Sequence, residues 1–202
     1  MIHSKKELAF YIKADNMMNC GYFTPSIAER IRRFVLGNEI MKFLKLMRKC
    51  QYYSQSGGVK YAYYQFRYIK ISKKLGFSIG SDVFGYGLVI PHYGTIVVGE
   101  NNKCGNYCVL HTSTCITGNG KTIGDALYLS TGAKITSKIT LGDNISVGAN
   151  SVVNKSFPDG NVMVAGAPAK VIKPAEPWYI RDGKSYTEKV RAIEELRTKM
   201  NL

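Results

Sequence analysis

A six-residue repeat between residues 79 and 157 constrains the fold of this chain more than any other feature. Apolar residues recur without a break at Ile123, Leu129, Ile135, Leu141, Val147 and Val153. Hexapeptide repeats are typical of a parallel β-helix, in which each unit supplies one short strand and one corner, and the apolar positions stack inward. The repeat therefore predicts roughly four triangular coils of about 18 residues each, with a spacing of about 4.8 Å between coils.

Two irregularities interrupt the repeat. An earlier run of apolar residues keeps the same interval, at Val98, Cys104, Leu110 and Ile116. This run is one residue out of phase with the later one, which predicts a single inserted residue near Lys121. A second disturbance lies around residues 91–97, and an insertion there would lift His92 out of the stacked wall. His92 is one of only three histidines in the chain.

The pattern divides the chain into three parts and predicts a mainly β fold with α elements. Residues 1–75 are expected to form a small helical region, residues 76–173 the parallel β-helix, and residues 174–202 an extended linker and a C-terminal helix. That last helix is expected to begin with a capping box from Ser185 to Glu188. It should pack on neighbouring subunits or cap an end of the coil stack, because solenoid ends need cover.

Positive charge is concentrated in residues 1–75, where the 3.6-residue period predicts two amphipathic helices, followed by a third from about Val59 to Leu75. The chain has a net charge of +14, and this part holds 15 Lys and Arg against 4 Asp and Glu, a net of +11. Such a field attracts anions, so contact with an anionic membrane face and an ordinary solvated surface both stay open. Nucleic acid is not expected, because no recognisable binding motif accompanies the charge.

The remaining composition narrows the compartment and the cofactor chemistry. No apolar window long enough to span a bilayer and no secretory signal is present, which predicts a cytoplasmic protein, either free in the cytoplasm or at the inner face of the membrane. The five cysteines are expected to be reduced in that compartment. Cys104 and Cys108 fall on the two inward positions of one repeat, so we assign them to the core and expect no metal site.

Five segments together resemble a known family, the left-handed β-helix acyltransferases. They read HYGTIVVGE, LHTSTCITG, LSTGAK, LGDNISVGANSVVNKSFPDG and VAGAPAKVIK. The resemblance covers roughly residues 60–173 and is strongest to serine acetyltransferase and to its relatives that O-acetylate sugars and capsular polysaccharide. It implies a left-handed coil, a homotrimer, and acetyl-CoA bound in the groove between adjacent subunits.

The resemblance also implies roles for individual residues. The histidine of the family's H-x-x-G-I-V-V-G-E segment falls on His92, where it acts as the general base. The small residues that face the CoA arm fall on Ser130, Gly148 and Ala149. A segment near the adenine end falls on residues 165–170.

The residues themselves add further candidates. A hydroxyl is a weak nucleophile, and an imidazole with a pKa near 6.5 can take its proton at neutral pH. His111 follows His92 by one coil and one further residue, near the same corner, where it is expected to orient His92, bind the acceptor or sit at the coil surface. The corner with Gly118 either presents backbone N–H groups to an oxyanion or is a plain turn. Lys155 and Lys170 are either contacts to CoA phosphates or solvated lysines.

Two departures from the family pattern bear on the acceptor. The family's serine enzymes carry an aspartate about fifteen residues before the histidine, where this chain has Phe77, and they carry a second histidine that the corner around Gly118 lacks. We therefore predict an acetyl-CoA-dependent O-acetyltransferase that acts on a sugar hydroxyl, in capsule, exopolysaccharide or envelope synthesis. Serine O-acetyltransferase and a non-catalytic trimeric scaffold are the alternatives.

Overall fold

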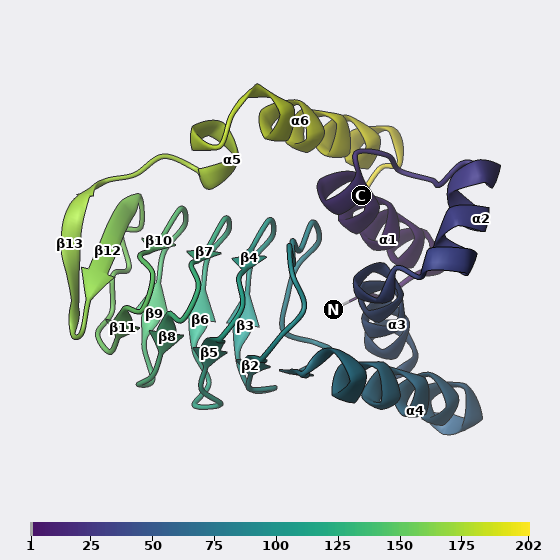
Figure 1. Cartoon of the computed structure of the whole chain (residues 1–202), viewed down its shortest axis with the longest axis horizontal. Helices are drawn as coiled ribbons and strands as arrows, with labels where there is room; N and C mark the ends of the chain where they lie inside the picture. Colours follow the sequence, from purple (N-terminus) through teal and green to yellow (C-terminus); the bar gives the residue numbers. More distant parts are fainter. Residues whose placement is uncertain (1) are drawn as a thin grey trace.

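A computed structural model describes residues 2–202 and confirms the expected fold class. It is a left-handed parallel β-helix, preceded by helices and followed by a C-terminal helix (Figure 1). The helices are α1 Lys5–Cys20, α2 Ile27–Leu36, α3 Glu39–Tyr53, α4 Gly58–Leu75, α5 Trp178–Arg181 and α6 Lys184–Lys199. None of these described helices is both long and apolar enough to span a bilayer.

The coils stack into a prism with three faces, each a sheet of short strands. The first face holds β1 Phe77–Ile79, β2 Ile96–Val98, β5 Thr114–Ile116, β8 Lys134–Ile135 and β11 Val152–Val153. The second face holds β3 Lys103–Cys104, β6 Thr122–Ile123 and β9 Thr140–Leu141. The third face holds β4 Val109–Leu110, β7 Tyr128–Leu129, β10 Ser146–Val147, β12 Val162–Gly166 and β13 Ala169–Pro174. All pairs are parallel except β12 with β13, a hairpin that ends the stack.

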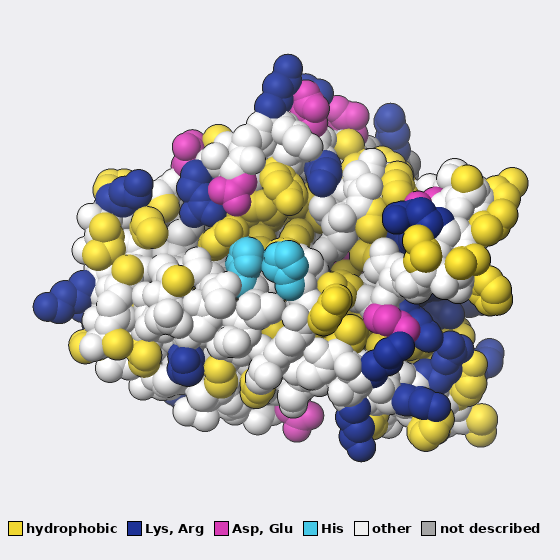
Figure 2. Space-filling model, in the orientation of Figure 1, with side chains coloured by type: hydrophobic (Ala, Val, Ile, Leu, Met, Phe, Trp, Pro, Cys, Tyr) yellow, Lys and Arg dark blue, Asp and Glu magenta, His cyan; other side chains and the backbone are white. Residues whose placement is uncertain are grey.

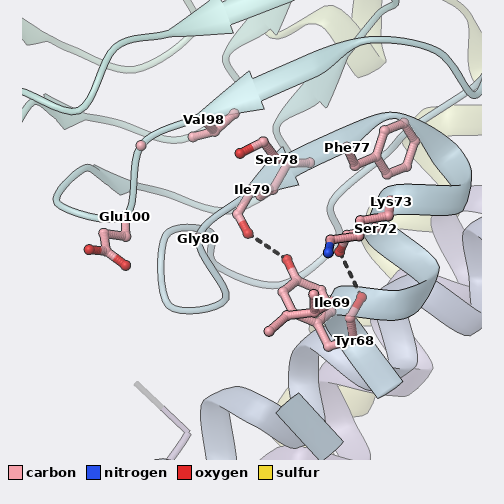
Figure 3. Close-up of a pocket in the computed structure, with 11 residues that line it drawn as sticks. Tyr68, Ile69, Ser72, Lys73, Phe77, Ser78, Ile79, Gly80, Val98 and Glu100 are labelled. Atoms are coloured by element: carbon pink, nitrogen blue, oxygen red, sulfur yellow. Dashed lines mark hydrogen bonds between the residues drawn. The ribbon is translucent and has the colours of Figure 1, made fainter. Parts of the chain in front are cut away.

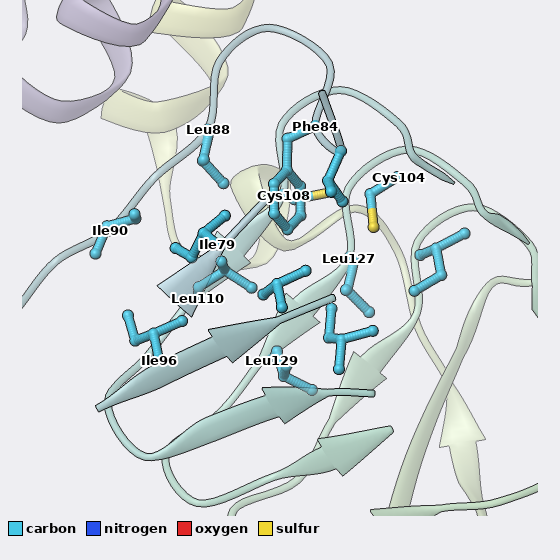
Figure 4. Packing of buried hydrophobic residues seen from close by; sticks show 14 of the residues in the cluster. Ile79, Phe84, Leu88, Ile90, Ile96, Cys104, Cys108, Leu110, Leu127 and Leu129 are labelled. Atoms are coloured by element: carbon cyan, nitrogen blue, oxygen red, sulfur yellow. The ribbon is translucent and has the colours of Figure 1, made fainter. Parts of the chain in front are cut away.

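The repeat positions form the interior of the prism, as predicted. All six residues of the main run are at most 3% exposed, and they join the cluster drawn in part in Figure 4. Cys104 and Cys108 lie in the same cluster, which confirms their core assignment. Burial raises the pKa of the Cys108 thiol to about 12, so this sulfur stays protonated at neutral pH.

The inserted residue lies where the phase shift predicted it. Cys104 pairs with Ile123, and Thr122 pairs with Thr140 in the next coil. The separation along the chain is one residue longer in the first pair than in the second. The extra residue enlarges the corner before Lys121, whose side chain is buried. The Lys121 ammonium donates hydrogen bonds to the carbonyl and the hydroxyl of Thr117, at 2.7 and 2.8 Å. These bonds offset the cost of burying a charged group.

The N-terminal helices cover the first coil. The expected helices are confirmed as α2, α3 and α4, and α1 is a further helix that the stripe analysis did not separate. Ser4 begins α1 with a complete capping box. α4 ends at Gly76, whose φ of 77° lies in the left-handed region that glycine adopts without strain, and the chain enters β1 directly.

The C-terminal helix differs from the prediction in two ways. It begins at Lys184 with Gly183 as its N-cap, and no side chain caps it, so the capping box at Ser185 was wrong. It also does not cap an end of the stack, while the other expected position, against neighbouring subunits, stays a prediction. The chain returns from β13 over the third face and places α6 beside α1 (Figure 1). The reason is a second apolar cluster, which includes Trp178, Ile193, Phe10 and Met18 and is buried between these elements and the outer side of the third face.

Candidate active site

One edge of the prism carries most of the predicted site residues. At this edge, named here the histidine edge, the chain turns from the third face to the first. His111, Ser130 and Gly148 occupy successive layers of it, because each donates its backbone N–H to the layer above, at 3.1, 3.2 and 2.8 Å. Ala149 follows Gly148, and Ala165 ends the series in β12.

His92 stands at the start of this edge because the first coil is longer there. Val89 pairs with Val109, and Val98 pairs with Ile116. The separation along the chain is two residues longer in the first pair than in the second. The extra residues therefore lie between Val89 and Val98, and the His92 side chain is exposed. The insertion around residues 91–97 thus has the structural effect that the sequence predicted.

His111 is half-buried one layer further along the edge. Its Nε2 lies 2.9 Å from the hydroxyl of Tyr128. Burial lowers the pKa of His111 below its usual value, the nearby charge of His92 lowers it further, and Asp182 opposes the shift. Figure 2 shows two neighbouring histidine side chains on one face of the molecule, in agreement with this coupling. Because this pKa lies below its usual value of about 6.5, His111 is mainly neutral at pH 7.

Helix α5 places a charged pair beside this histidine. The Arg181 guanidinium lies 4.4 Å from the centre of the Tyr128 ring. It donates one hydrogen bond to the Ser146 hydroxyl, at 3.1 Å, and another to the Asp182 carboxylate, at 2.7 Å. Sequence reasoning missed these residues. The repeat itself could have placed Tyr128 next to His111, but no pattern shows where α5 lies.

Two predicted site residues lie on another edge of the prism. Gly118 and Lys155 are exposed at corners between the first and second faces. A Cβ added to Gly99 would lie 2.2 Å from the Cα of Gly118, so the tight stacking of these two corners requires glycine at position 99. Within one chain, therefore, the structure does not bring Gly118 or Lys155 to His92. Lys170 is exposed in β13, opposite Ala165 at the end of the histidine edge.

A cavity of about 220 Å³ adjoins the histidine edge next to Pro91. It lies between α1, the first coil, the start of α3 and α6. The residues that line it are Met18, Asn19, Cys20, Asn38, Ile40, Met41, Val89, Ile90, Pro91 and Tyr186. None of these ten side chains is an ionised Lys, Arg, Asp or Glu, so the cavity suits a neutral group.

A second cavity, of about 460 Å³, lies between α4 and strands β1 and β2 (Figure 3). Phe77 is 4% exposed there and packs its ring edge-on against Phe43, with centroids 5.0 Å apart. The Tyr68 hydroxyl donates a 2.6 Å hydrogen bond to the Ile79 carbonyl and ties α4 to β1. None of the predicted catalytic or CoA-binding residues lines this cavity, and Phe77 has a packing role.

The described part of the chain offers no cluster of side chains suited to binding a metal ion. Across residues 2–202, no group of three or more His, Cys, Asp or Glu side chains is arranged to hold a metal ion.

The coil stack and its histidine edge define the class of left-handed β-helix hexapeptide proteins, and the comparisons confirm the resemblance to the serine acetyltransferase-like members. No protein-family model matches the sequence. The serine acetyltransferase of Helicobacter pylori strain J99 is 35% identical over 95 residues, which is 44% of this chain and 55% of that protein. The chain spans about half the length, or less, of the curated relatives it matches.

Solved structures share the fold over a longer stretch. Neisseria gonorrhoeae serine acetyltransferase aligns with a TM-score of 0.68 and 21% identity, over 86% of this chain and 69% of that one. Brucella abortus S19 serine acetyltransferase in complex with coenzyme A aligns with a TM-score of 0.64 and 24% identity, over 84% and 68%. At these identities the alignments establish the fold, including its N-terminal helices.

Proposed function

We propose that this protein is an acetyl-CoA-dependent O-acetyltransferase that transfers an acetyl group to an acceptor hydroxyl. The observation that supports this most strongly is the exposed His92 beside the neutral His111, on a fold whose relatives are named serine acetyltransferases. One of the structural neighbours has been solved with coenzyme A bound. That precedent supports acetyl-CoA as the donor here.

In the proposed reaction, His92 acts as the general base. Its imidazole takes the hydroxyl proton while the acceptor oxygen bonds to the thioester carbon. The C–S bond then breaks, and the proton passes to the CoA sulfur, so that an ester and free CoA are released. Ser130, Gly148 and Ala149 are proposed to face the CoA arm, because small side chains allow it to approach the edge closely.

Serine is the acceptor that the comparisons favour, in place of our initial preference for a sugar. The curated relatives carry the name serine acetyltransferase, and the Neisseria gonorrhoeae neighbour has also been solved with serine. Free serine carries both an ammonium and a carboxylate group at neutral pH. Arg181 and Asp182, which sit beside His111, offer one opposite charge to each.

A sugar hydroxyl is the second candidate, and specific features favour it. The cavity beside Pro91 is lined by uncharged side chains, which suits a neutral acceptor. Phe77 stands where the family's serine enzymes carry an aspartate, and it is buried in the core. The corner around Gly118 also lacks the second histidine of those enzymes.

The test is CoA release from acetyl-CoA, followed with a thiol reagent, with L-serine and with a panel of sugars and nucleotide sugars. We expect turnover with serine, and a loss of about 10²- to 10⁴-fold in His92→Ala, the usual range for general-base help. Arg181→Gln should raise the KM for serine. Arg191→Gln is its matched control, because Arg191 is exposed on α6, away from the edge. We also propose a homotrimer, because in the family that this chain resembles acetyl-CoA binds in the groove between adjacent subunits. Light scattering on the same sample tests this assembly.

The other outcomes are equally informative. Turnover with a sugar alone would reject serine and support the second candidate. CoA release that is unaffected by His92→Ala would reject His92 as the base. A folded trimer with no CoA release on any acceptor would favour the scaffold alternative.

A further inference from the structure

Helix α2 has the opposite orientation to an ordinary amphipathic surface helix. Its apolar residues point away from the protein, and none of its residues is buried. Phe34 is 91% exposed, Ile27 77% and Val35 71%, and Ile31 lies on the same face. A helix normally turns such a stripe toward the core. An exposed apolar stripe of this kind is typical of an interaction surface.

The polar side of α2 packs against the rest of the protein. Glu29 accepts a 2.8 Å hydrogen bond from the Tyr22 hydroxyl, and Arg33 donates to the same hydroxyl at 2.5 Å. Arg33 also lies 3.2 Å from the Cys20 sulfur, at the end of α1. The side chains of Glu29 and Arg33 are only 16% and 17% exposed. These contacts hold the helix with its apolar face outward, and Figure 1 shows α2 projecting from one end of the molecule.

A cationic cavity lies at the foot of this helix. It has a volume of about 680 Å³ and is lined by Lys13, Arg30, Arg33 and Lys45, with no acidic residue among its lining side chains. The pKa of Lys45 is lowered by burial first and then by Lys49 and Arg30. Helical periodicity puts Arg30 at the border of the apolar stripe and Arg32 at its opposite border. Arg32 already pairs with Glu29 at 2.7 Å, so an anion near α2 would meet the cations of this cavity, on the Arg30 side.

We propose that α2 lies in the interface of an anionic lipid bilayer, with Ile27, Ile31, Phe34 and Val35 inserted and the cations on lipid phosphates. Exposed apolar residues flanked by Arg are the features of an interfacial helix. A second α2 face fits this surface less well, because each face lies beside the cationic cavity and two such faces would bring like charges together. A bilayer with anionic headgroups supplies both an apolar layer and the opposite charge.

Co-flotation of the whole protein with lipid vesicles tests this proposal. We expect binding to vesicles that contain phosphatidylglycerol, little binding to pure phosphatidylcholine, and weaker binding in high salt. The variant Ile31→Ser/Phe34→Ser/Val35→Ser should bind at least about tenfold more weakly, because three side chains no longer enter the apolar layer. Its melting temperature should not fall, because these side chains are exposed in the protein.

The matched control is Val171→Ser/Ile172→Ser, which removes an exposed apolar pair from β13, at the other end of the molecule. This control should bind vesicles like the wild type. Equal binding by the α2 variant, or no wild-type binding to anionic vesicles, would overturn the proposal. A smaller assembly in the α2 variant by light scattering, without wild-type vesicle binding, would assign the face to a second copy instead.

Discussion

At the scale of single residues, the site depends on how two histidines differ in environment. His92 is exposed, whereas His111 is half-buried against the Tyr128 hydroxyl. The Arg181 guanidinium lies 4.4 Å from the centre of the same Tyr128 ring. The pKa of His111 is lowered by burial first and by the charge of His92 second, so these two side chains interact across one layer of the edge. We infer that the Tyr128 contact positions the His111 ring beside His92.

The lowered pKa of His111 predicts how stability depends on pH. The unfolded chain takes up a proton at His111 near pH 6.5, whereas the folded protein does so only at a lower pH. The stabilisation is therefore complete above pH 6.5 and is lost as the pH falls through the interval between the two values. Melting temperatures measured across this interval should fall less in His111→Gln than in the wild type. Parallel curves for the two proteins would contradict the shift.

At the scale of elements, one buried ion pair connects the helices to the first coil. The Arg48 side chain of α3 has 0% exposure and donates to the Asp15 carboxylate of α1, at 2.8 Å. It also donates to the carbonyls of Phe84 and Gly85, at 2.7 and 2.6 Å. A single side chain therefore satisfies polar groups from α1 and from the turn that begins the coil stack.

Asp15→Asn should destabilise the protein strongly, because it leaves the Arg48 charge buried without a counter-ion. We expect the free energy of unfolding in urea to fall by about 3–5 kcal/mol. Glu39→Gln provides the comparison, since it removes a pair with Lys74, whose side chain is 64% exposed. That change should cost about 1 kcal/mol or less. Similar losses in the two variants would mean that Asp15 is not needed to neutralise Arg48.

At the scale of the whole molecule, the two ends of the chain are packed together. The C-terminal segment crosses the third face and brings α6 to α1, while α5 carries Arg181 to the histidine edge. Trp178 anchors this crossing. It is 2% exposed, and its Nε1 donates a 2.7 Å hydrogen bond to the Tyr107 carbonyl.

Trp178→Ala should loosen the whole C-terminal segment. We expect a loss of about 3–5 kcal/mol in the free energy of unfolding, the usual range for removing a large buried aromatic side chain. Trypsin should also cut sooner after Arg181 in this variant. Trp178→Phe keeps most of the packing and loses mainly the hydrogen bond, so its cost should be near 1 kcal/mol. Unchanged trypsin sensitivity in Trp178→Ala would show that α6 holds the segment by itself.

Much of the fold follows from local pattern, and the six-residue period is the clearest case. A period of six places Ile123, Leu129 and Ile135 in the interior of the prism, independently of any long-range contact. The reason is that each coil repeats the geometry of the previous one. The same periodicity located the insertion before Lys121, the extra residues beside His92 and the buried Cys104 and Cys108. The amphipathic stripe of α2 was also visible, but the direction in which it points was not.

What the sequence by itself determined was therefore the coil stack, its inward side chains and the exposed position of His92, since these depend on spacing along the chain. The tertiary structure alone decided that α6 packs on α1, that Arg181 lies on Tyr128 beside His111, and that the apolar side of α2 faces outward. These features depend on contacts between residues far apart in sequence, and no period in the chain encodes such contacts.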